Sequence, residues 1–112
     1  MSDELKHQVR EHWEQETCGT RYGHGEDREA YFDEIYRSRY ERTDYLREFA
    51  GFAEARGKRI LEIGVGAGSD FRSWLENGAA VTGIDLTEAA VRLTAEHLKV
   101  KGRHTAPHEL RR

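Results

Sequence analysis

The segment LEIGVGAGSD, residues 61–70, carries glycine at every second position directly after a short apolar run. Residues 59–65 begin with an arginine and then form a nearly continuous apolar run interrupted by Glu62, a composition typical of a buried strand. Glycine has no Cβ, so it accepts positive φ angles and lets a ligand lie against the backbone. A helix that follows such a loop presents free N–H groups to a polar ligand. The segment therefore predicts a strand, a binding loop and a helix in succession.

The residues that follow repeat this pattern. Residues 69–76 are predicted to form a helix capped by Ser69 or Asp70, and an Asn-Gly pair stops it. Residues 80–86 (AVTGIDL) form a second predicted strand, after which Thr87 is placed to cap a third helix. Strand, helix, strand, helix with short connections is the signature of a parallel sheet. We expect an α/β fold in which a right-handed crossover brings the carboxyl ends of both strands together, where ligands bind in open sheets.

The N-terminal half predicts helices. Residues 3–16 carry apolar side chains at a spacing of four among many charges, which indicates a short amphipathic helix. Residues 17–29 contain three glycines in a polar run and are predicted to be a loop. Residues 32–53 show apolar and aromatic side chains at three- and four-residue spacing, typical of one face of a long helix, broken near residues 42–44.

Composition and charge limit the possible classes of protein. The 112 residues allow one small domain, and a formal charge of −3 does not favour nucleic-acid binding. Cys18 is the only cysteine, so neither an intrachain disulfide nor a cysteine metal cluster is expected. We find neither a signal peptide nor an apolar stretch long enough to cross a membrane, and expect a soluble cytoplasmic protein without a membrane partner.

Three regions are predicted along the chain. Residues 1–56 form a helical segment, residues 57–102 form the α/β region, and residues 103–112 form a basic tail. The last 16 residues hold one acid and five bases. We interpret this end as a solvated tail rather than a surface for nucleic acid or anionic lipid.

The spacing of glycines and acids discriminates between possible ligands. A dinucleotide fingerprint, G-x-G-x-x-G, would need a third glycine where Ser69 stands, and no Gly-Lys-Ser/Thr phosphate loop follows. Asp85 lies 21 positions after Gly64, where an acid can accept both hydroxyls of a ribose; alternatively it caps the helix after Thr87. Glu62 needs a partner inside an apolar strand, which is a ligand or a set of backbone donors. The pattern favours a nucleoside cofactor over a nicotinamide dinucleotide.

Stretches in both halves of the sequence resemble a known protein family. The first half of the core of class I S-adenosylmethionine-dependent methyltransferases is similar to RILEIGVGAGSDFRSWLENGAAVTGIDLTEAAVRLT, and the resemblance covers roughly residues 58–102. The N-terminal helical segment of one methyltransferase subgroup resembles HWEQETCGTRYG and YFDEIYRSRYE. The resemblance implies a Rossmann-like methyltransferase fold, truncated after its first two parallel strands, with S-adenosyl-L-methionine as the cofactor.

The same resemblance assigns roles to individual residues. The implied cofactor-binding residues are Glu62, Gly64, Gly66, Gly68, Asp85, Leu86, Gly19 and Tyr22. Asp85 would bind the ribose hydroxyls, and Leu86 would pack on the adenine. Gly19 and Tyr22 would close over the cofactor, while Glu62 and the loop glycines would line its methionine and ribose part. No catalytic residue is implied, because the residues that face the methyl acceptor follow later in the family's chain.

The tail RHTAPHELRR resembles none of the family's remaining strands. Pro107 disfavours a helix that would pair His104 with His108, so no metal site is expected. We expect a truncated methyltransferase that holds half of the cofactor site and is weakly active or inactive alone, with an unknown methyl acceptor. The alternative is a non-catalytic remnant or interaction module. Its exposed sheet edge would bind a complementing chain or a second copy of itself.

Overall fold

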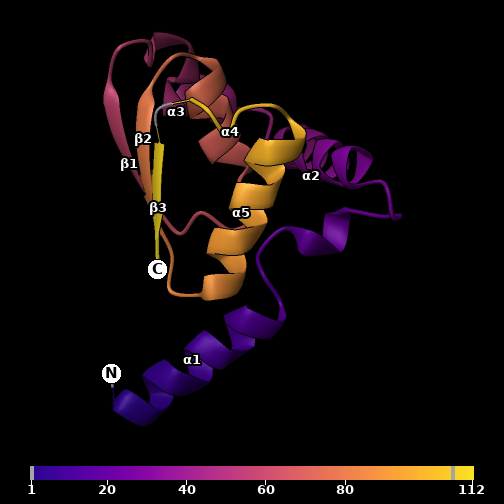
Figure 1. Cartoon of the computed structure of the whole chain (residues 1–112), viewed down its shortest axis with the longest axis vertical. Coiled ribbons are helices and arrows are strands. Elements are labelled where there is room, and N and C mark those ends of the chain that lie inside the picture. The colour runs from indigo at the N-terminus through magenta and orange to yellow at the C-terminus, as the bar shows by residue number, and fades with distance from the viewer. Residues whose placement is uncertain (1, 107) are drawn as a thin grey trace.

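The computed structural model describes residues 2–106 and 108–112; Met1 and Pro107 lie outside the described residues. The elements in chain order are α1 (Asp3–Gln15), η1 (Thr20–Tyr22), α2 (Arg28–Arg42), α3 (Leu46–Ala50), η2 (Phe52–Glu54), β1 (Arg59–Ile63), α4 (Ser69–Glu76), β2 (Ala80–Ile84), α5 (Glu88–Val100) and β3 (His108–Arg111). Figure 1 shows the strands side by side, with α4 and α5 on one side of the sheet. The predicted α/β class is confirmed.

The sheet has three parallel strands in the order β1-β2-β3. β1 and β2 are paired along their full length, so Ile63 lies opposite Ile84 at their carboxyl ends. The strand count differs from the prediction, because β3 pairs with β2 from the register of Val81 with His108 onward. The prediction of a solvated tail is therefore wrong for its last part. The free edge of β2 offers a ladder of hydrogen bonds that outweighs the weak local preference of these residues for a strand.

The core lies between the sheet and the two helices that cover it. It is formed by Ala55, Val65, Phe71, Leu75, Ala79, Val81, Ala90 and Leu98, with Ile60, Trp74, Ala106 and Leu110 packed against them. Gly83 in β2 lets α4 approach closely, since a Cβ there would lie 2.6 Å from both Phe71 and Val65. Thr87 caps α5 as predicted, accepting a hydrogen bond from the backbone N–H of Ala90 at 3.2 Å.

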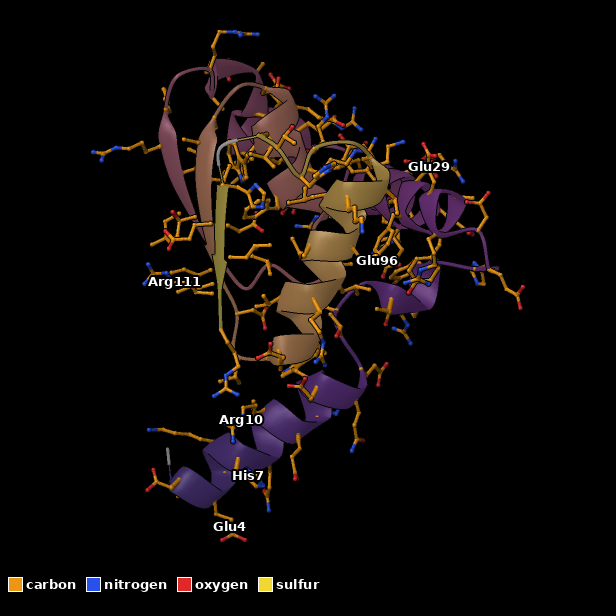
Figure 2. The ribbon with its side chains drawn as sticks, in the orientation of Figure 1. Glu4, His7, Arg10, Glu29, Glu96 and Arg111 are labelled. Carbon is orange, nitrogen blue, oxygen red and sulfur yellow. The ribbon has the colours of Figure 1, made fainter. Side chains whose placement is uncertain are left out.

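α2 packs on the outer side of α4 and α5. Phe32 and Ile35 of α2 are buried against Ala67 in a second small core. One bidentate ion pair flanks this core, because Arg28 donates two hydrogen bonds to the carboxylate of Glu96 at 2.7 and 2.8 Å. Figure 2 shows Glu96 between α5 and α2. The predicted helix break is confirmed, since residues 43–45 separate α2 from α3.

α1 is the predicted amphipathic helix, but its apolar stripe is not part of the core. Figure 1 shows it standing apart from the body, below the carboxyl end of β3. Trp13 remains 42% exposed. Glu14 ties the helix to the start of α5 by accepting a hydrogen bond from the N–H of Ala89 at 2.8 Å. Among the described residues, none of the helices combines the length and apolar character needed to cross a bilayer.

Candidate cofactor-binding site

A cavity of about 1230 Å³ opens at the carboxyl ends of the strands, between the glycine loop, α1 and α2. All of the predicted site residues line it: Glu62, Gly64, Gly66, Gly68, Asp85, Leu86, Gly19 and Tyr22. Val9 and Trp13 of α1 form part of the opposite wall. The cavity is not smaller than the volume of about 300–1,000 Å³ that is usual for a small-molecule site, so it has room for a nucleoside cofactor.

Two positions of the glycine loop show why the loop requires glycine. Gly68 has φ +89°, and a Cβ there would lie 3.1 Å from Thr94 of α5. Gly64 has φ +81°, but a Cβ there would meet no protein atom within 4 Å. Gly68 therefore allows α5 to pack closely, whereas Gly64 leaves space on the cavity side.

The helix start differs from the sequence prediction. Gly68 occupies the N-cap position of α4 without a side-chain capping bond, so the prediction that Ser69 or Asp70 caps this helix is wrong. The Asp70 carboxylate lies in the first turn of α4 and accepts two hydrogen bonds from Arg39, both at 2.7 Å. A strong partner on α2 has replaced the local capping contact.

Asp85 joins the ends of β1 and β2. Its Oδ2 accepts a hydrogen bond from the N–H of Gly66 at 3.2 Å, and its Oδ1 accepts one from the N–H of Thr87 at 3.0 Å. Its own N–H donates to the carbonyl of Arg111 at 3.0 Å, so β3 helps to fix it. The cap of α5 is Thr87, so Asp85 does not itself cap the helix but holds the cap residue, and the same carboxylate lines the cavity.

Glu62 points toward the helices from β1 and reaches the cavity. Its Oε1 is buried and has no hydrogen-bond partner among the described residues. Burial, followed by the nearby charge of Asp70, raises the pKa of Glu62 to about 8. The backbone donors considered as an alternative partner are thus not found for this oxygen, and the carboxyl group is held largely in its neutral form at pH 7.

Arg39 is a cavity residue that the sequence prediction missed. Its hydrogen bonds with Asp70 hold the pKa of the guanidinium above its usual value, so the group stays charged beside the acids of the site. Tyr40 donates a further hydrogen bond to Asp70 at 2.8 Å. The apolar spacing of α2 gave no sign of this cluster, because its members are 30 and 31 positions apart in sequence.

The loop between α1 and α2 forms another wall of the cavity. Gly19 adopts φ +92° at the start of η1, where its neighbours are Ile35 and Ala67. Tyr22 lies beneath the guanidinium of Arg42, whose central carbon is 3.6 Å from the ring centroid. The N-terminal segment thus reaches the cavity that the glycine loop opens on.

A glycine-rich loop at the carboxyl end of a parallel strand, with an acid ending the next strand, is the arrangement found in Rossmann-like α/β proteins. Similar proteins of known name narrow the class of protein further. The chain is 37% identical over 71 residues to the ubiquinone biosynthesis O-methyltransferase of Pseudomonas aeruginosa. The matched segment makes up 63% of this chain and 29% of that protein. The protein of the same name from Aromatoleum aromaticum is 42% identical over 67 residues, covering 60% and 27%. That from Stutzerimonas stutzeri is 33% identical over 76 residues, covering 68% and 32%.

The chain therefore spans less than a third of the length of these curated relatives. No family model matches it. The predicted resemblance to the N-terminal portion of class I S-adenosylmethionine-dependent methyltransferases is confirmed by the relatives.

Proposed function

We propose that the cavity binds S-adenosyl-L-methionine and that this chain supplies the cofactor-binding part of a methyltransferase. The observation that carries the proposal is the cluster of Glu62, Asp70, Asp85 and Arg39 at the glycine-loop end of the cavity wall. The cofactor carries an ammonium, a carboxylate, a sulfonium and a ribose diol. The carboxyl groups of this cluster suit the ammonium group and the ribose diol, and Arg39 suits the carboxylate. Glu16 and five further arginines line the rest of the cavity.

The residues present fit the cofactor in three places. Glu62 has a buried oxygen without a partner in the described chain, and a cationic group in the cavity would favour its ionised form. The open side of Gly64 gives the ligand access to bare backbone. Leu86, 51% exposed at the end of β2, offers an apolar surface for the adenine.

When bound, the cofactor supplies an electrophilic methyl group on a sulfonium. The part of this chain is to bind and orient the cofactor, which is where most of the rate of a methyl transfer arises. Asp85 would accept the ribose hydroxyls while its contacts with Gly66 and Thr87 keep the carboxylate in place. Gly19 and Tyr22 would close the cavity from the N-terminal side.

Calorimetric titration of the chain with S-adenosylmethionine and S-adenosylhomocysteine tests the proposal. Asp85→Asn keeps an oxygen for the N–H of Thr87 but removes the charge, and we expect it to weaken binding at least about tenfold. Glu88→Gln is the matched control, because it removes an exposed acid from the first turn of α5. Its affinity should stay within about twofold of the original. A chain that binds neither compound, or an Asp85→Asn variant that binds equally well, would refute the proposal.

A second candidate function is a non-catalytic interaction module. The observation that favours it is the open face of the sheet, where Leu61 and Ile63 of β1 are 60% and 76% exposed. Both faces of a parallel sheet are ordinarily covered. Binding of a partner on this face without any cofactor binding would favour the module over the methyltransferase part.

A further inference from the structure

Helix α5 donates two side-chain hydrogen bonds to the glycine loop from beneath. Thr94 Oγ1 donates to the carbonyl of Gly66 at 3.0 Å. His97 Nδ1 lies 2.7 Å from the carbonyl oxygen of Ala67, and since a carbonyl only accepts, Nδ1 must carry the proton. Both side chains are 0% exposed. Two successive carbonyls of the loop are thus fixed to one helix.

The surroundings of His97 show that its role is not simple packing. Phe32 of α2 stacks on the imidazole with a centroid distance of 4.5 Å, and Nε2 is buried without a partner among the described residues. Burial lowers the pKa of His97 to about 4, which keeps the ring neutral. A leucine would fill such a site without an orphaned nitrogen. The contact that an apolar residue could not replace is the hydrogen bond to Ala67.

The charged groups around this histidine come from two helices and from the residue that follows α5. Asp33 of α2 lies between Arg72 of α4 and Lys101, accepting hydrogen bonds at 2.9 and 3.1 Å. Arg72 and Lys101 disfavour a positive charge on His97, whereas Asp33 favours it. Their ion pairs with one another leave burial as the dominant influence on the ring.

We propose that Thr94 and His97 are positioning residues of the cofactor site, which set the direction of the loop peptides that face the ligand. A trans peptide points its N–H opposite to its C=O. Holding the Gly66 carbonyl against α5 therefore turns the N–H of Ala67 away from α5, and Ala67 lines the cavity. The bond from His97 to the Ala67 carbonyl fixes the next peptide, whose N–H belongs to Gly68 and donates within the loop to the carbonyl of Val65 at 3.0 Å. This inference rests on the proposed cofactor binding, because it concerns the same loop.

Three variants test the role on the full chain. Thr94→Val keeps the shape of the side chain and removes the donor, and His97→Leu fills the space without a donor. His97→Asn keeps an amide donor near the position of Nδ1. Leu98→Ala is the control, because it removes buried volume from the same helix but no hydrogen bond to the loop.

The measurements are the dissociation constant for S-adenosylhomocysteine, the stability in urea, and the amide hydrogen exchange of residues 64–69. Loss of one hydrogen bond should weaken binding about fivefold in Thr94→Val and His97→Leu, with partial recovery in His97→Asn. The exchange of the loop amides should accelerate in the same two variants. Leu98→Ala should lose stability while its affinity stays within about twofold.

Affinities that follow stability alone, with Leu98→Ala as impaired as His97→Leu, would overturn the positioning role. If the unsubstituted chain binds no S-adenosylhomocysteine, the proposed function fails. The exchange measurement then decides by itself whether α5 holds the loop. Unchanged exchange of residues 64–69 in Thr94→Val and His97→Leu would overturn that as well.

Discussion

The two faces of the sheet have the same kind of residues but opposite surroundings. Along β1, Ile60 points into the core beneath the helices, whereas Leu61 and Ile63 on the other face are largely exposed. Figure 1 shows α4 and α5 on one side of the strands, and Figure 2 shows Arg111 of β3 pointing away from α5. The apolar run of β1 is therefore typical of a strand that is covered on both faces. The described residues cover only one of these faces.

The first prediction tests this difference in packing. Phe71→Ala removes a fully buried ring from the covered face, and we expect the free energy of unfolding to fall by about 3–5 kcal/mol. Leu61→Ala on the open face should change it by no more than about 0.5 kcal/mol. Urea denaturation monitored by circular dichroism measures both, at a protein concentration low enough for the chain to be monomeric.

Phe71→Leu, a smaller change, keeps the comparison measurable if the alanine variant does not fold. A loss in Leu61→Ala as large as that in the Phe71 variants would contradict the comparison. It would mean that the second face is covered even in the monomer.

The second prediction concerns the acid on the covered face. The pKa of Glu62 is about 8 in the folded chain, above its usual value of 4.5, so the folded state keeps a proton that the unfolded state releases. The contribution of Glu62 to the free energy of unfolding should therefore be fully present below pH 4.5 and decrease as pH rises toward and through 8. Glu62→Gln stays neutral and should lack this decrease. The variant should be more stable than the original by about 2–4 kcal/mol at pH 8.

The control for this prediction lies on the open face. Glu109→Gln removes the same charge from an exposed position of β3, and its stability should follow that of the original chain within about 0.5 kcal/mol at every pH. Urea denaturation at several pH values supplies the data. A parallel pH dependence in Glu62→Gln and the original chain would show that Glu62 is not the group that titrates.

The parts of the molecule that depend on local patterns could be predicted from the sequence. The two strands, the glycine loop, the cap at Thr87 and the break between α2 and α3 follow from apolar spacing and capping residues. The site residues were found to line one cavity because the carboxyl ends of adjacent parallel strands meet at one edge.

The parts that depend on distant partners could not be predicted. β3 forms because β2 offers it an edge, and four residues such as His108–Arg111 carry little strand signal of their own. Arg39 and His97 act through contacts with residues 31 and 30 positions away, which no local spacing reveals. The burial of His97 could not be predicted because a polar side chain is not counted in an apolar stripe, although His97 shares a helix face with Thr94 and Leu98.

The smallest effect on stability is expected for Leu61→Lys, which places a charge on the open face. Because an exposed apolar sheet face favours association, we predict that the original chain self-associates through it and that this variant is monomeric. Phe49→Lys is the control, since Phe49 is 83% exposed on α3 rather than on the sheet. Sedimentation velocity over a range of concentrations should show a rising mass for the original chain and for Phe49→Lys, but not for Leu61→Lys. The unfolding free energy of the Leu61→Lys monomer should differ by only about 0.5 kcal/mol, because the substituted side chain contacts mainly solvent. A monomeric original chain at all concentrations would show that the open face does not bind a second copy.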